Sequence, residues 1–168
     1  SFREAMGTST YWVLSLLFFV DVFNINTVMV HIVQSAEDLL IPAAAAVSIL
    51  SVTAALSIVG RISAGALADK MGIKRTIFIG MSTMLFAFVW ILCTKTLAAF
   101  YVFAVAFGIG GWAVGAVLSP LVAEFFGFKS HGLILGAVTF TGTLGGALGP
   151  LVAGRIFDTT GNYQTAFL

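Results

Sequence analysis

The residues of this sequence best able to do chemistry are polar side chains inside long apolar runs. Asp21 lies near the centre of the first run, and Asn24, Val28 and His31 follow it at steps of three and four residues. On a helix this spacing puts them on one face, so we predict a polar stripe with a protonatable carboxyl group and imidazole. In the alternative interpretation, Asp21 and Asn24 hydrogen-bond a neighbouring helix and His31 lies at the helix end.

Arg61, in the next apolar run, is the second candidate. It precedes Asp69 by two helical turns, about 12 Å along a helix axis, and shares a face with Ala54, Ser57 and Gly65. A planar guanidinium on such a small, polar face can bind a carboxylate through two parallel N–H···O bonds. We therefore favour an anion-binding role. The alternatives are a structural ion pair with the carboxylate of the first run and contact with lipid headgroups.

The elements that hold these residues must cross a membrane. Of 168 residues, 60% are apolar and 9% are charged, and the mean hydropathy is +1.08. A soluble domain carries about 25% charged residues, so a soluble globular domain and a disordered chain are both excluded. The formal net charge of +1 predicts no nucleic-acid partner. The sequence has no phosphate-binding loop and no metal-ligand spacing, so we expect neither enzymatic activity nor a cofactor.

Five apolar segments are each long enough for a membrane-spanning helix, which needs about 20 residues. We therefore predict an all-α, polytopic membrane helix bundle, with bends at Pro120 and Pro150 and a sixth helix that begins near Tyr163. Because the chain starts at Ser1 rather than at a methionine, we interpret it as a fragment of a longer protein. The predicted segments are residues 11–33, 42–68, 76–94, 97–126 and 132–157.

Lysine and arginine are distributed unequally between the connecting loops, and this predicts the orientation of the chain. Cytoplasmic loops carry an excess of these residues. Lys95 and Arg155 fall on one side, and five basic residues fall on the other. We therefore place the amino end and the 69–75 loop in the cytoplasm, with the bundle in the plasma (inner) membrane. The five are Arg3, Lys70, Lys74, Arg75 and Lys129.

The sequence also contains an internal repeat. Residues 60–72 (GRISAGALADKMG) and 149–161 (GPLVAGRIFDTTG) share glycine, alanine, glycine, aspartate and glycine at one constant offset. The same offset aligns the first segment with the fourth, so the repeat unit holds three helices, and an odd number of helices reverses the topology. We therefore predict inverted three-helix repeats, residues 1–95 and an incomplete 96–168, of the kind that secondary transporters use.

Residues 65–75 (GALADKMGIKR) resemble the cytoplasmic loop signature G-x-L-x-D-x-x-G-x-[KR]-[KR] of the major facilitator superfamily. The order of the loops matches the carboxy-terminal half of that family, which implies helices seven to eleven and the start of helix twelve. Residues 30–69 and 149–167 look like the monocarboxylate transporter and oxalate/formate antiporter branch. The resemblance covers nearly all of this chain and implies a missing amino-terminal six-helix half.

The resemblance also implies roles for the residues of the 65–75 loop. In the family, this loop is associated with locking one face of the transporter closed, so we assign Asp69 to conformational control. Gly65 and Gly72 let helix ends approach closely and turn sharply. Lys74 and Arg75 are suited to contact anionic lipid headgroups.

By the same resemblance, Arg61 lies at the position of the helix-eight arginine that binds the anion. This implies a secondary active transporter of small organic anions, either monocarboxylates or short dicarboxylates. It would use protons or a counter-anion as the coupling partner and alternating access within the lipid bilayer. The chain has Ser57 where animal monocarboxylate carriers place an acidic residue, and its fifth segment has no lysine, where the oxalate carrier has one. The alternatives are a drug/proton antiporter or another branch, in which Asp21 matters more than Arg61, and a non-transporting membrane sensor.

Small residues gather on one face of each of the last two segments, where they allow helix backbones to pack closely. We assign Trp112, deep in the fourth segment, to core packing, with the wall of a substrate cavity as the alternative. The two faces are Gly108, Gly111, Gly115 and Ser119 in the fourth segment, and Gly142, Gly146, Gly149 and Ala153 in the fifth.

Overall fold

The computed structural model describes residues 1–93, 95–161, 163 and 167. Within these residues the regular structure is entirely helical, as the apolar runs predict. The helices are α1 (Phe2–Met6), α2 (Ser9–Glu37), α3 (Ala43–Met71), α4 (Ile73–Leu92), α5 (Leu97–Gly110), α6 (Ala113–Phe126) and α7 (His131–Thr160).

Five stretches of the described chain are long and apolar enough to cross a membrane. They are α2, α3, α4, the pair α5 and α6 taken together, and α7. The five predicted spans are therefore confirmed, and the bundle is that of a multi-pass integral membrane protein. Their ends shift by a few residues, and Thr94, the predicted end of the third span, lies outside the described residues. The predicted sixth helix near Tyr163 also falls mostly outside them.

The helical interruption of the fourth span lies at Gly111 and Trp112, between α5 and α6, whereas α6 continues through Pro120 and α7 through Pro150. Glycine costs about 1 kcal/mol per position in a helix relative to alanine, and Gly110 precedes Gly111 directly. A proline inside a membrane helix is tolerated where neighbouring groups satisfy the freed backbone carbonyl. The consecutive glycines, and not the proline, therefore mark the break.

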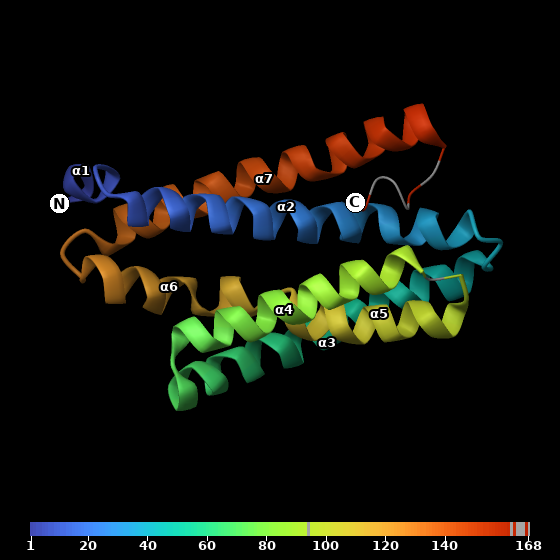
Figure 1. The fold of residues 1–168 in the computed structure, drawn as a ribbon, viewed down its shortest axis with the longest axis horizontal. Helices are drawn as coiled ribbons and strands as arrows, with labels where there is room; N and C mark the ends of the chain where they lie inside the picture. The colour runs from blue at the N-terminus through green and yellow to red at the C-terminus, as the bar shows by residue number, and fades with distance from the viewer. Residues whose placement is uncertain (94, 162, 164–166, 168) are drawn as a thin grey trace.

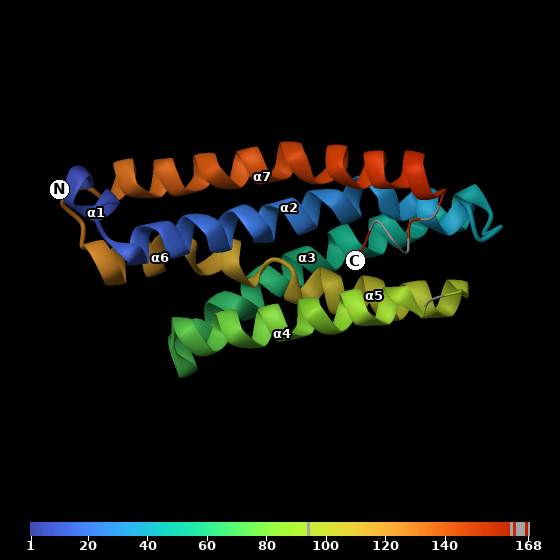
Figure 2. The same cartoon turned by 45° about the horizontal axis from the view of Figure 1, so that its top comes forward.

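The spans form two groups that share a core. Helix α7 lies alongside α2, and α3, α4 and α5 lie together on the other side of α2 (Figures 1 and 2). The buried face of α2 carries Val28 and Ile32, which pack into one apolar cluster with Ile49 of α3 and with Phe103 and Phe107 of α5. Large side chains fill the space between the groups, so α2 acts as the central element of the bundle.

The amino end and the loops divide between the two ends of the bundle. Helix α1, the α3–α4 turn and the α6–α7 connection lie at one end (Figure 1). The α2–α3 turn and the α4–α5 connection lie at the other end. The loops with excess lysine and arginine therefore share one end, as the predicted orientation requires.

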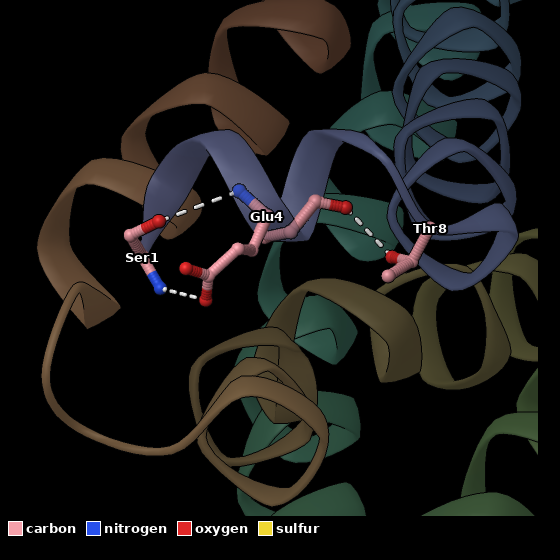
Figure 3. A network of polar contacts seen from close by, with 4 residues as sticks. Ser1, Glu4 and Thr8 are labelled. Atoms are coloured by element: carbon pink, nitrogen blue, oxygen red, sulfur yellow. Dashed lines mark hydrogen bonds and ion pairs between the residues drawn. The ribbon is translucent and has the colours of Figure 1, made fainter.

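Helix α1 was not among the predicted elements. The Ser1 hydroxyl accepts the Glu4 backbone N–H at 3.5 Å, and the Glu4 carboxylate accepts from the Ser1 backbone nitrogen at 2.8 Å (Figure 3). This capping box satisfies backbone donors at the helix start. Thr8 then donates to the Ala5 carbonyl at 2.6 Å and caps α2.

Candidate functional site

Arg61 lies inside the α3 span and is exposed on the surface of the bundle. It precedes Met71, the last residue of α3, by ten positions, or about 15 Å along the helix axis. Its guanidinium carbon lies over the ring of Trp112, 4.1 Å from the ring centroid. Among the described residues, no carboxylate lies within ion-pair distance of Arg61. The structural ion pair with Asp21, one of the alternatives for this residue, is therefore not formed here.

Trp112 is the residue immediately before α6, at the break between α5 and α6. Its side chain is partly buried and packs against the apolar cluster that joins α2, α3 and α5. The indole N–H is buried and has no hydrogen-bond acceptor among the described residues. Packing, together with the cation–π contact, therefore holds this ring. Core packing was the assignment from sequence, but the contact with Arg61 could not be read from spacing.

The backbones around Arg61 and Trp112 approach closely. A Cβ atom at Gly60 would lie 2.5 Å from the carbonyl oxygen of Ile109, and a Cβ atom at Gly108 would lie 2.8 Å from the Cβ atom of Leu56. Both positions therefore need glycine for α3 to lie against α5. Gly60 is adjacent to Arg61, so this contact fixes the backbone that carries the guanidinium.

Asp21 is 4% exposed on α2. It lies one turn before Ile25, which belongs to the apolar core cluster. Neither Asp21 nor the half-buried Asn24 has a hydrogen-bond or ion-pair partner among the described residues. Because a charge inside a membrane is costly, a buried carboxyl group without a partner is a candidate for proton binding.

His31 has two hydrogen-bond partners, which separates it from Asp21. Its Nε2 lies 2.9 Å from the carbonyl oxygen of Pro150 in α7, and its Nδ1 lies 3.3 Å from the hydroxyl of Tyr163. A carbonyl oxygen only accepts, so Nε2 carries the proton and Nδ1 accepts from the phenol. Burial, with the charges of Asp38 and Asp158, raises the pKa of Tyr163. The imidazole of His31 thus links α2 to α7.

The α3–α4 turn depends on Gly72, which has φ +90° and ψ 153°, a conformation that is essentially restricted to glycine. Asp69 is exposed and has no ion-pair partner among the described residues. The Lys74 ammonium lies 5.6 Å from the centroid of the Phe125 ring of α6. Residues 71–75, which include Arg75, and Glu124 line one shallow groove at this end of the bundle.

Gly65, the other glycine of the loop signature, makes no close approach. A Cβ atom at this position would have nothing within 4 Å.

Glycines also bring α7 against α2. A Cβ atom at Gly142 would lie 2.5 Å from the ring of Phe18, and one at Gly146 would lie 2.9 Å from the amide of Asn26. A Cβ atom at Gly149 would overlap the Phe23 carbonyl. Gly145 makes an equally close approach that we did not single out from the sequence; it precedes Gly149 by four residues and so lies on the same helix face.

The glycines of the fourth span have looser surroundings. Gly111 lies in the helix break beside the Phe107 carbonyl, and Gly115 has only the Phe18 ring within 4 Å.

Comparison with known proteins agrees with this architecture. Residues 11–168 match the family described as Major Facilitator Superfamily. Monocarboxylate transporter 13 of Rattus norvegicus is 31% identical over 83% of this chain and 33% of its own length. Monocarboxylate transporter 12 of Homo sapiens is 26% identical over 87% of this chain, and monocarboxylate transporter 9 of Rattus norvegicus is 28% identical over 95%. The chain spans about a third of the length of these curated relatives. It belongs to the major facilitator superfamily and is distantly related to the monocarboxylate transporters.

Proposed function

We propose that this chain is part of a secondary active transporter of small organic anions, either monocarboxylates or short dicarboxylates. The observation that carries the proposal is Arg61, an exposed arginine inside a membrane span with no carboxylate partner among the described residues. Charged side chains inside membrane spans rarely face lipid, and they commonly mark a substrate or ion pathway. The relationship to proteins named monocarboxylate transporters supports a carboxylate as the anion.

In the proposed mechanism, the guanidinium of Arg61 forms two parallel hydrogen bonds with the substrate carboxylate. The anion then enters a site of low dielectric constant as an ion pair. The buried carboxyl group of Asp21 takes up and releases the coupling proton, with Asn24 beside it on the same helix. Exchange against a counter-anion is the other coupling mode. Alternating access follows from rocking of this bundle against a second six-helix bundle, with the site between them near the midplane.

The proposal extends to the orientation and the internal symmetry of the bundle. We infer that the end with the 69–75 loop faces the cytoplasm of a plasma (inner) membrane, since excess lysine and arginine mark cytoplasmic loops. Asp69, at the end of α3, then controls the closing of the cytoplasmic face. The inverted three-helix repeat over residues 1–95 and 96–168 remains a prediction from the sequence.

The burial of Asp21 without a partner among the described residues supports a second candidate function, a drug/proton antiporter. A buried carboxylate without a partner can bind either a proton or a cationic substrate, which would make Asp21 the substrate residue. Arg61 would then have no direct contact with the substrate. The two functions differ in the charge of the compound carried, so one transport assay separates them.

The test is uptake of labelled lactate, formate and oxalate by the full-length protein in proteoliposomes, under an inward proton gradient. Arg61→Gln is compared with Arg155→Gln, because Arg155 is an exposed arginine near the end of α7. We expect saturable uptake that Arg61→Gln abolishes and Arg155→Gln retains, with both variants folded and inserted. Equal uptake by the wild type and Arg61→Gln would contradict the proposal. Absence of carboxylate uptake would favour the antiporter, with Asp21→Asn as the next variant.

A further inference from the structure

We propose that Trp112 is a positioning residue for Arg61, and that its indole ring holds the guanidinium in the orientation that binds the carboxylate. The inference rests on the proposed anion-binding role of Arg61. The observation behind it is the cation–π contact, in which the guanidinium carbon lies 4.1 Å from the ring centroid. A guanidinium within about 6 Å of an indole centroid is attracted by the negative face of the ring.

The contact places the guanidinium carbon over the face of the Trp112 ring. The five N–H donors of a guanidinium point outward from its edge, and no described residue accepts from them. These donors are therefore available to a carboxylate while the ring supports the group from one side. A guanidinium already held in place loses less conformational freedom when the anion binds, and this preorganisation raises affinity.

No other described group performs this function for Arg61. The described residues place no carboxylate within ion-pair distance of it, and no hydrogen bond of its side chain occurs among them. An arginine that faces a cavity without any contact would sample many rotamers. Trp112 is thus the residue that limits the positions of this guanidinium.

The backbone contacts around the pair make the arrangement rigid. Gly60 brings the α3 backbone against α5 at Gly108 and Ile109, directly beside Arg61. Trp112 follows Gly108 by four residues, at the start of α6, where its ring packs against the apolar cluster. The two side chains therefore project from backbones that are in direct contact, which fixes the position of the ring relative to Arg61.

The indole N–H has no acceptor among the described residues, so the ring itself is what matters. This makes Trp112→Phe and Trp112→Leu an informative pair of variants. Phenylalanine keeps an aromatic face beside Arg61, whereas leucine keeps only apolar bulk. Trp112→Met is a second apolar variant without a ring, to be used if the leucine variant does not insert. Trp12→Leu, which removes a tryptophan near the start of α2, is the control.

The experiment measures initial uptake rates of the full-length protein in proteoliposomes as a function of concentration. The probe is the carboxylate among labelled lactate, formate and oxalate that gives the lowest wild-type KM. We expect Trp112→Leu to raise KM about 5- to 30-fold, the range of a partly desolvated cation–π contact, and to change the maximal rate much less. Trp112→Phe and Trp12→Leu stay within about twofold of the wild type. An unchanged KM in Trp112→Leu and Trp112→Met would overturn the inference, as would a Trp112→Phe defect equal to that of Trp112→Leu.

A double-mutant cycle shows whether Trp112 acts through Arg61. Lysine keeps the charge of Arg61 but lacks the planar face that stacks on the ring. We expect Trp112→Leu to change KM much less in the Arg61→Lys background than in the wild type, because coupled residues are not additive. Equal effects in both backgrounds would contradict a role through Arg61.

Arg61→Gln, measured in parallel, distinguishes failure of the proposed function from failure of the positioning role. If it transports like the wild type, the proposed function fails. If it is impaired while Trp112→Leu is not, only the positioning role fails.

Discussion

At Gly72 the backbone between α3 and α4 has φ +90° and ψ 153°. A side chain in this region costs about 1–3 kcal/mol, because a Cβ atom clashes with the adjacent peptide groups. We therefore predict that Gly72→Ala lowers the free energy of unfolding by about that amount. The measurement is the thermal unfolding midpoint of the purified full-length protein in detergent.

Gly65→Ala is the matched control for Gly72→Ala, since both glycines belong to the 65–75 loop signature. Gly65 is inside α3, and a Cβ atom there would have nothing within 4 Å. Alanine is favoured over glycine in a helix by about 1 kcal/mol, so the unfolding midpoint should stay the same or rise. A lower midpoint for Gly65→Ala than for Gly72→Ala would contradict the assignment of strain to Gly72.

The hydrogen bond from His31 to the Pro150 carbonyl gives a second prediction for a single residue. His31→Ala leaves that carbonyl of α7 without this donor and removes the acceptor of the Tyr163 hydroxyl. A lost buried partner costs about 1–3 kcal/mol, so we expect a clear fall in the unfolding midpoint. Tyr163→Phe keeps the stacking on Phe157 at 4.1 Å and should cost less, about 0.5–1.5 kcal/mol. A larger fall in the unfolding midpoint for Tyr163→Phe than for His31→Ala would show that His31 is not a structural link.

Residue types and spacing predicted some of these environments and missed others. The depth of Arg61 and Asp21 in the membrane follows from counting along apolar runs. The partners of Arg61 and His31 do not, because Trp112 and Pro150 lie on other helices, and period and hydropathy carry no information on contacts between helices. The His31 side chain is on the predicted stripe, but it contacts the Pro150 carbonyl of α7 and the hydroxyl of Tyr163, which follows that helix.

The contact between α2 and α7 depends on Gly145, where a Cβ atom would overlap the Phe19 carbonyl of α2. Because a carbonyl of a packed helix cannot move aside easily, overpacking should separate the two helices. We predict that Gly145→Ala lowers the free energy of unfolding by about 1–3 kcal/mol. Gly136→Ala in the same helix, where the position is open, should have no such effect. Equal unfolding midpoints for the two variants would contradict this packing.

The extent of each span could be predicted, but its continuity could not. A run of twenty or more apolar residues between polar loops predicts a membrane helix, because a helix forms all its backbone hydrogen bonds within the segment. The spans were therefore placed to within a few residues. Two features were missed. The break at Gly111 and Trp112 depends on consecutive glycines, which hydropathy does not register. Helix α1 is too short to have a periodic pattern, and only the spacing of Ser1 and Glu4 signals its capping box.

At the scale of the whole molecule, the proposed orientation predicts which loops each side of the membrane can reach. In a Cys93→Ser background, a cysteine at Lys129 lies in the α6–α7 connection and one at Leu40 lies in the α2–α3 turn, at the opposite end of the bundle. We predict that an impermeant maleimide labels Leu40→Cys from outside intact cells and Lys129→Cys only after permeabilisation. Labelling of Lys129→Cys from outside would reverse the orientation.

The central claim is that Arg61 recognises the negative charge of a carboxylate, and binding of matched anionic and neutral compounds tests it most directly. Lactate and lactamide are compared by the concentration at which each raises the thermal unfolding midpoint of the purified full-length wild type and of Arg61→Gln, a measurement that needs no uptake. Removing one partner of a hydrogen-bonded charge pair costs about 2 kcal/mol or more, a factor of about 30. We predict that the wild type prefers lactate by at least that factor and that Arg61→Gln loses the preference. An unchanged preference in Arg61→Gln would contradict the account.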